Sequence, residues 1–205
     1  YLGAEYRDAD GRRFAGESAN SRQIALETAG LVCTWRGRLF CTYYSAVCGG
    51  RTTPGKSVFT DAADLLESVE CRWCRAADRY RWTSRVSRDE ASDAVGRYFR
   101  ESGKPFGRLA SIARAGNPQG AIALFEVSDG RGRRTISATA LVRCFPPSTL
   151  PSARFEVKFD GDSLVFEGRG HGHGVGLCQW GARGLAESGR SCLEILEYYY
   201  PGSQV

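Results

Sequence analysis

The spacing of apolar side chains along the chain predicts several short helices. Between residues 89 and 102, apolar side chains recur three and four positions apart, as on one face of a helix, and Gly103 and Pro105 follow as stop signals. Residues 191–200 begin with Ser191-x-x-Glu194, the pattern of a capping box. Three further segments are expected to be helical: 18–29, 179–188 and, for one or two turns, 137–144.

Shorter runs of β-branched and aromatic residues predict strands and two hairpins. One hairpin is expected around Arg36-Gly37-Arg38 and the other around Asp160-Gly161-Asp162, because Gly and Asp suit tight turns. Hairpins and short strands with segregated helices predict an α+β fold, in a single domain over residues 1–205. The predicted strands are 31–35, 39–47, 78–87, 109–113, 121–127, 154–159 and 163–167, and residues 1–17 are expected to form a loop or edge segment.

The composition is that of a globular protein, with 42% hydrophobic and 25% charged residues among 205. No apolar run reaches the roughly 20 residues that a membrane-spanning helix needs. The 28 basic residues exceed the 23 acidic ones, for a net charge of +5. They are scattered between acids, so we expect no nucleic-acid partner. The chain has no Met and begins without a secretion signal, so it is expected to be a mature or excised piece.

The eight cysteines are many for a cytosolic domain and would allow four disulfides in an oxidising compartment. The one local signature is Cys71-x-x-Cys74, which is half of a zinc site, a redox pair or two plain thiols. Cys33 and Cys41 flank a predicted turn, so a bridge between them is possible. Three others, Cys144, Cys178 and Cys192, are expected to be small buried side chains.

The only two histidines, His171 and His173, lie in a run of alternating glycines from Gly170 to Gly176. Glycine neighbours leave an imidazole unshielded, so it can reach a bound substrate or a carboxylate. Two other interpretations remain: a loop whose histidines hydrogen-bond the backbone, and a metal-binding His-x-His. A phosphate-binding loop is excluded because the Lys and Ser/Thr of that motif do not follow.

Two patches of the chain resemble the SpoIID/LytB family. The C-terminal patch matches a family pattern of Gly-His-Gly-Val-Gly, then Gln, an aromatic residue and Gly-Ala, then a helix ending in Tyr-Tyr-Pro-Gly. In this chain the part from the glycines to Gly-Ala is Gly168 to Ala182, and the Tyr-Tyr-Pro-Gly ending closes at Gly202. Together the patches cover about residues 20–55 and 135–202. The second patch is carried by Ala25, Thr28, Gly30, Val32, Gly37, Tyr44, Gly49, Gly50 and Thr52.

The resemblance implies action on bacterial peptidoglycan outside the cytoplasm. The family's enzymes are lytic transglycosylases, which cut between N-acetylmuramic acid and N-acetylglucosamine without water, leave 1,6-anhydro ends and prefer peptide-stripped strands. One glutamate serves first as acid and then as base, with its pKa raised by a partly apolar cleft. The alternative is a non-catalytic wall-binding module that enhances an amidase partner. A third interpretation is a zinc hydrolase using His171 and His173.

In the family, the catalytic glutamate lies in a segment upstream of a Tyr-x-Gly motif, and Tyr1-Leu2-Gly3 resembles that motif. The chain is therefore expected to lack the catalytic glutamate. Whether the chain alone is an enzyme stays open. His173 and Gln179 match family positions and are expected to support catalysis. The resemblance places a substrate-binding wall at Tyr44, Gly49, Gly50, Thr52 and His171.

Within the resemblance, Cys48 precedes Gly-Gly and joins Cys71 and Cys74 as three thiolates of a structural zinc site. The fourth ligand stays open, because Cys41 is about seven residues up a strand and too distant. A disulfide between two of the three, or free thiols, are the alternatives.

Overall fold

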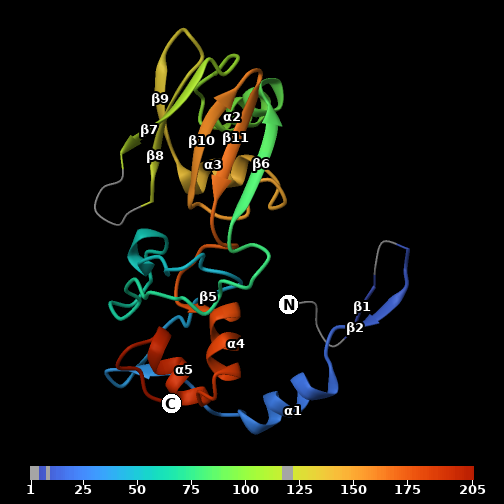
Figure 1. Ribbon diagram of the computed structural model, residues 1–205, viewed down its shortest axis with the longest axis vertical. Coiled ribbons are helices and arrows are strands. Elements are labelled where there is room, and N and C mark those ends of the chain that lie inside the picture. Colours follow the sequence, from blue (N-terminus) through green and yellow to red (C-terminus); the bar gives the residue numbers. More distant parts are fainter. Residues whose placement is uncertain (1–4, 8–9, 117–121) are drawn as a thin grey trace. The chain divides into compact units, whose positions relative to one another are not determined.

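The computed structural model describes residues 5–7, 10–116 and 122–205 of the chain, apart from the side chain of Tyr6. The chain divides into two compact units, one of residues 1–33 with Val205 and one of residues 34–204 (Figure 1). Among the described residues, no helix is both long and apolar enough to cross a membrane.

The first unit holds a small hairpin and one helix. Strands β1 (Glu5–Arg7) and β2 (Arg13–Ala15) pair antiparallel, so a hairpin occupies part of the stretch expected to be a loop or edge segment. Helix α1 (Ala19–Glu27) begins where predicted, because Ser18 and Ser21 form a reciprocal capping box. Every side chain of α1 is exposed.

The second unit contains two three-stranded antiparallel sheets. One has the order β10-β11-β6, and the predicted hairpin around Asp160-Gly161-Asp162 is its β10–β11 pair. The other has the order β7-β8-β9. Their bounds are β6 (Trp82–Ser87), β10 (Phe155–Asp160), β11 (Ser163–Gly168), β7 (Ser111–Gly116), β8 (Leu124–Ser128) and β9 (Arg133–Ser137).

The main hydrophobic core lies between these sheets and two helices, α2 (Arg88–Glu101) and α3 (Ala138–Cys144). Both helices were predicted, and each begins at a serine whose hydroxyl accepts a backbone N–H three residues on. At the centre, the rings of Phe125 and Phe155 stack with centroids 5.3 Å apart, and Phe166 meets Phe155 edge-on. These aromatic side chains therefore join the two sheets.

The rest of the second unit has little regular structure and carries the site. Strands β3 (Thr34–Trp35) and β4 (Arg38–Leu39) form the predicted first hairpin, although they are shorter than expected. Strand β5 (Tyr44–Ser45) pairs in parallel with β12 (Leu177–Cys178), so two segments far apart in sequence meet. The remaining helices are the short 3-10 helix η1 (Gly55–Ser57), α4 (Gln179–Glu187) and α5 (Cys192–Tyr199), and α5 has the predicted capping box.

Several sequence-based predictions are wrong in detail. The predicted strand 78–87 begins only at Trp82, since residues before it form turns. Cys33 and Cys41 are not bridged, and none of the eight cysteines, all of which lie in the described part of the chain, is in a disulfide. Cys192, expected to be buried, is exposed, and Cys144 is only partly buried.

Candidate functional site

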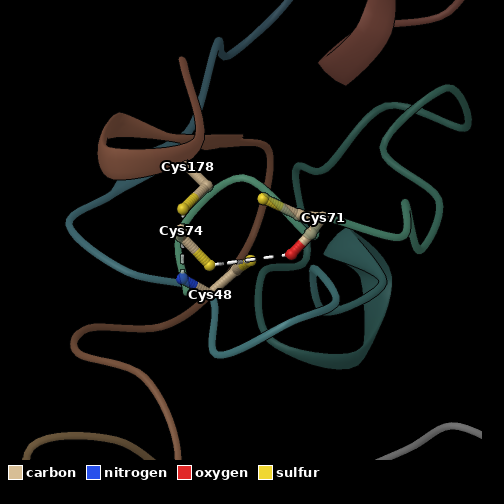
Figure 2. Close-up of side chains that lie close together, drawn as sticks. All are labelled: Cys48, Cys71, Cys74 and Cys178. Carbon is tan, nitrogen blue, oxygen red and sulfur yellow. Dashed lines mark hydrogen bonds between the residues drawn. The ribbon is translucent and has the colours of Figure 1, made fainter. Parts of the chain in front are cut away.

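Four buried cysteines form one cluster. Cys48, Cys71, Cys74 and Cys178 are each at most 1% exposed. Their sulfur atoms all lie within 4.8 Å of one another, and Figure 2 shows the side chains converging from three segments of the chain. The sulfurs of Cys48 and Cys74 are 3.6 Å apart. Four thiolates around a tetrahedral zinc ion would be about 3.8 Å apart, so the spacing fits such an ion.

Backbone pairing brings these four residues together. The parallel pair β5–β12 sets Cys178 opposite Ser45, close to the strand that leads to Cys48. The amide of Cys71 donates to the carbonyl of Gly50 (3.0 Å), which ties the Cys71-x-x-Cys74 turn to the same loop. The cluster thus joins three segments that are separated by up to 130 positions, from Cys48 to Cys178.

The surroundings of the sulfurs suit thiolates. The amide of Cys48 donates to the sulfur of Cys178 (3.2 Å). Cys178 is also the N-cap of α4, and the positive end of a helix stabilises an anion. Hydrogen bonds from Cys178 and its neighbours lower the pKa of Cys74 and lower that of Cys71 to about 7. Hydrogen bonds with Cys178, Cys71 and Cys74, followed by burial, raise the pKa of Cys48. Although the hydrogen bond with Cys48 lowers it, the pKa of Cys178 is raised overall by its contacts with Cys71 and Cys74 and by burial. Two of the four thiols therefore hold their protons unless a cation is present.

Cys178 is the fourth member of the cluster, and sequence reasoning missed it. It was expected to be an ordinary buried side chain, and it is buried, but its sulfur completes the set begun by Cys48, Cys71 and Cys74. The available signal was its place inside the glycine-rich motif, two residues after Gly176. Among the described residues, no other set of three or more His, Cys, Asp or Glu side chains lies close enough together to hold a metal ion, so His171 and His173 belong to no such cluster.

The glycine-rich loop of residues 168–176 lies directly beside the cysteine loop. Gly170, Gly172, Gly174 and Gly176 all have positive φ, and a side chain on Gly170 would place Cβ 2.6 Å from the carbonyl of Val47. The alternating glycines are therefore required for close backbone packing. The hydrogen bonds that hold the loop include His171 N–H to Val47 O (2.7 Å), Thr53 N–H to Gly174 O (2.8 Å), Gly172 N–H to Pro151 O (2.8 Å) and Trp82 Nε1–H to Gly170 O (3.0 Å).

His173 is held in a defined orientation. Its Nδ1 accepts the amide of Val175 (3.0 Å), so the proton of the neutral ring is on Nε2. The ring meets Phe59 and Tyr43 edge-on, with centroids 5.0 and 5.9 Å away. Burial lowers its pKa, and a backbone hydrogen bond with Tyr44 offsets part of that effect. His173 is thus a neutral, fixed ring at neutral pH.

A cleft of about 1200 Å³ opens beside this loop. It is lined by His171, His173 and Thr52, three residues predicted for the site. The predicted residue Tyr44, whose exposed fraction is 61%, lines a smaller pocket that also has His173 in its lining. The structure therefore brings both histidines, Thr52 and Tyr44 into one region.

The other residues predicted for catalysis or substrate binding, Gly49, Gly50 and Gln179, lie outside the lining of these two pockets, whereas Cys48 lines the larger one. Gly49 and Gly50 have positive φ; a Cβ on Gly49 would come within 2.8 Å of Gly170, and one on Gly50 within 2.9 Å of the Tyr80 hydroxyl. They serve backbone packing. Gln179 is exposed at the start of α4. Even Thr52 has its hydroxyl occupied, since it accepts the amide of Val69 (2.7 Å).

A hydrogen-bonded group beside His173 was not found from the sequence. Asp61 accepts the hydroxyl of Tyr43 (2.6 Å) and the thiol of Cys41 (3.2 Å). The bond to Asp61 raises the pKa of Tyr43 to about 12, and the same contacts lower the pKa of Asp61. The ring of Tyr43 stacks on Phe59 with centroids 4.0 Å apart. This group therefore fixes the aromatic side chains against which His173 packs.

Comparisons with known proteins found one family model and several similar sequences. A family model described as a domain of unknown function, DUF8618, matches residues 62–176. An uncharacterized protein of Brachyspira hyodysenteriae is 30% identical over 85% of this chain and 45% of its own length. Stage II sporulation protein D of Bacillus subtilis is 25% identical over 98% of this chain and 55% of its own length. The amidase enhancer of the same organism is 25% identical over 91% of this chain and 32% of its own length.

The chain thus spans between about a third and just over half of the curated relatives it matches. Because it covers 98% of this chain, the similarity to stage II sporulation protein D of Bacillus subtilis includes both patches noted above. The chain belongs to the family described as domain of unknown function DUF8618 and is SpoIID/LytB-like.

Proposed function

We propose that this chain forms the glycan-binding cleft of a peptidoglycan lytic transglycosylase that works outside the cytoplasm. The relatives named stage II sporulation protein D and amidase enhancer support a role at the cell wall. The observation that carries the proposal is the cleft of about 1200 Å³, which has both histidines of the glycine-rich motif on its wall. A volume of this size suits a chain of sugar rings better than a single small molecule.

The cleft supplies binding and orientation for the proposed reaction. His173 is neutral and does not itself change charge near neutral pH; its Nε2–H, which the backbone of Tyr44 engages in the free protein, is the donor that it would offer a sugar hydroxyl. The general acid must be a carboxyl group with a raised pKa. Both glutamates on the cleft wall are ion-paired instead, Glu156 with Arg114 and Glu167 with Lys158. We therefore assign the acid to a residue outside the cleft lining described here.

The test is product analysis with the full-length protein that contains this chain. It is incubated with peptide-stripped glycan strands, and the products are read by mass for 1,6-anhydro ends. We expect anhydro products from the full-length protein and loss of most of them in His173→Ala. A variant in the turn between β8 and β9, Arg131→Gln, is the matched control and should keep full turnover, because Arg131 is exposed and outside the cleft lining.

The competing function gives a different result. A non-catalytic amidase enhancer would bind the same strands without forming anhydro ends and would raise the rate of an added amidase. Glycan binding with no anhydro product, together with amidase stimulation, would replace the transglycosylase proposal by the enhancer.

We further propose that the cysteine cluster holds one structural zinc ion, with Cys48, Cys71, Cys74 and Cys178 as its ligands. Four buried sulfurs fill all four positions of a tetrahedral site, which leaves none for water or substrate. When bound, the ion would neutralise the thiolates and cross-link the three segments. Its role is therefore folding of the cleft wall, not catalysis.

Metal analysis tests the zinc proposal. The purified protein should contain one zinc per chain, and X-ray absorption should show four sulfurs at about 2.3 Å. Cys178→Ser should lose most of the metal, while Cys192→Ser, which removes an exposed cysteine outside the cluster, should keep it. Stoichiometric iron, or a mass lowered by the four hydrogens of two disulfides, would overturn the assignment.

A further inference from the structure

A row of three arginines crosses one end of the sheet β10-β11-β6 (Figure 1). Arg154, Arg169 and Arg81 each directly adjoin the last paired position of one of these strands. The amide of Arg169 donates to the carbonyl of Arg154 (3.0 Å), so these two residues lie opposite each other. The amide of Gly170 donates to the carbonyl of Tyr80 (3.3 Å), which continues the register between the other two strands and sets Arg81 opposite Arg169.

The three arginine side chains share one face of the sheet. Residues directly opposite each other on neighbouring strands point to the same side, with Cβ atoms about 4.5–5.5 Å apart, and like charges in such pairs repel. All three arginines line the cleft, so this face is part of its wall. Burial lowers the pKa of Arg154, and the charges of Arg169 and Arg51 lower it further. Positive charge is therefore crowded at this point of the cleft wall.

Two of the three guanidinium groups have no partner among the described residues. Neither an ion pair nor a side-chain hydrogen bond engages Arg81 or Arg169 there, and both side chains are exposed. Arg154 differs, because its Nη1 donates to the carbonyls of Cys48 (2.8 Å) and Arg51 (2.6 Å), which holds its guanidinium in place. The row thus combines one fixed cation with two that are available to a ligand.

The carboxylates of the next row on this face are already paired. Glu156 and Glu167 lie opposite each other, two positions along their strands from the arginine row. Glu156 pairs with Arg114, and Glu167 pairs with Lys158. These carboxylates therefore leave the arginine row without a counter-charge, and an anion from solution would supply one.

We propose that Arg81 and Arg169, with Arg154 beside them, form a binding site for a phosphate group that is borne by a sugar or free in solution. A phosphate group presents its oxygens at tetrahedral angles and carries up to two negative charges, so it can accept hydrogen bonds from two guanidinium groups at once. A carboxylate has only two oxygens, which a single guanidinium can engage. The inference goes beyond the proposed function and does not depend on glycan cleavage.

The cleft favours a sugar phosphate over a nucleic acid. Binding of single strands relies on exposed aromatic side chains on which bases stack. The aromatic residues that line this cleft are Phe59, which is half-buried, and Trp82 and Phe155, which are buried. Arg169 lies two residues before His171, so a sugar that carries the phosphate would lie beside the glycine-rich loop.

Binding measurements with small ligands test the site. The full-length protein is titrated in a calorimeter at low salt with inorganic phosphate, N-acetylglucosamine 6-phosphate, unmodified N-acetylglucosamine and acetate. We expect both phosphates to bind at least tenfold more tightly than acetate or the unmodified sugar, and the difference to shrink as salt concentration rises. Tighter binding of the sugar phosphate than of inorganic phosphate would assign the site to a phosphorylated sugar. Equal binding would assign it to the free ion, and both results support the site.

Two double variants that remove the same number of charges separate a local site from overall charge. Arg81→Gln/Arg169→Gln should weaken phosphate binding at least tenfold. Arg85→Gln/Arg131→Gln, which replaces two arginines outside the cleft lining, should bind like the unaltered protein. Phosphate at ten times its Kd should raise the Tm of the unaltered protein by about 3–6 °C and leave that of Arg81→Gln/Arg169→Gln unchanged. Because the replaced side chains are exposed, circular dichroism of both variants should be unchanged.

Three results would overturn the phosphate site. One is equal weakening by the two double variants, because only overall charge would then matter. The others are acetate binding as tightly as phosphate, and an oligonucleotide binding more tightly than the sugar phosphate. Formation of anhydro ends is measured separately, so loss of the phosphate site would leave the proposed function standing.

Discussion

The hydroxyl of Tyr199 lies 3.1 Å from the sulfur of Cys71, and this contact ties helix α5 to the cysteine cluster. Tyr199 is 1% exposed, so its hydroxyl has no access to water as an alternative partner. Burial, followed by the contact with Cys71, raises the pKa of Tyr199. The phenol is therefore a neutral donor to the sulfur, and it links the family's Tyr-Tyr-Pro-Gly ending to the proposed metal site.

Replacing this donor should weaken metal binding. Tyr199→Phe keeps the ring and removes only the hydrogen bond, so we expect a loss of about 1–2 kcal/mol in stability and roughly 10- to 100-fold faster loss of zinc to a chelator. Tyr198→Phe is the control, because the Tyr198 hydroxyl donates to the Glu70 carbonyl instead (2.6 Å). Equal zinc release from the two variants would show that Tyr199 does not act on the sulfur.

Gly181 in the Gln-Trp-Gly-Ala motif should be intolerant of any side chain. A Cβ there would lie 2.0 Å from the Tyr199 hydroxyl and 2.5 Å from the Cys71 sulfur. Gly181→Ala should therefore cost about 1–3 kcal/mol through overpacking and lower the zinc content. Gly96→Ala in α2 is the matched helical control: its Cβ would meet only the Phe106 carbonyl at 3.5 Å, so the variant should gain up to about 1 kcal/mol. Thermal unfolding of both variants measures the difference.

Metal removal should loosen the cleft wall while leaving the sheets intact. Val47 pairs with His171 and is followed directly by Cys48, so releasing the cluster frees one side of the glycine-rich loop. After chelation, hydrogen exchange should accelerate in residues 168–176 and leave β7, β8 and β9 unchanged, because these strands belong to a separate core. Uniform acceleration would instead mean global unfolding, and no acceleration would disconnect the cluster from the cleft.

Local sequence signals predicted most of the helices and the two hairpins because capping and turn chemistry act over a few residues. Ser191-x-x-Glu194 marked the start of α5, and Asp160-Gly161-Asp162 marked the turn between β10 and β11. The parallel pair β5–β12 carries no such signal, since its two residues per strand are set by long-range packing.

The same distinction applies to the site. Cys71-x-x-Cys74 was visible because two ligands on one turn have a fixed spacing. Cys178 was missed because it enters the cluster through the β5–β12 pair, and Asp61 because it meets Tyr43 across 18 positions of irregular chain. The alternating glycines were recognised, but their main physical role, close packing against Val47 and its neighbours, became clear only from the structure.

Asp61 should make the stability depend on pH on the acid side. Hydrogen bonds from Tyr43 and then Cys41 lower its pKa from 3.8 in the folded state. A carboxyl group with a lowered folded pKa stabilises the protein above its unfolded pKa, and that contribution is lost as pH falls through the folded value. The Tm difference between the unaltered protein and Asp61→Asn should thus be constant from about pH 5 to 7 and shrink below about pH 4. Asp93→Asn on α2 is the control, and a difference that persists undiminished in strong acid would contradict the assignment.

His173 offers a way to separate loop anchoring from contact with the glycan. His173→Ala leaves the amide of Val175, a fully buried residue, without its acceptor and should cost about 1–3 kcal/mol. In His173→Asn, the side-chain amide oxygen can take the place of Nδ1, so stability should largely return. The Asn variant still lacks the ring edge against Phe59 and the proton on Nε2, and we therefore expect its glycan binding to remain at least tenfold weaker than that of the unaltered protein. Full recovery of both stability and binding would show that His173 only anchors the loop, whereas poor stability in both variants would indicate that packing of the ring, and not the Val175 bond, holds it in place.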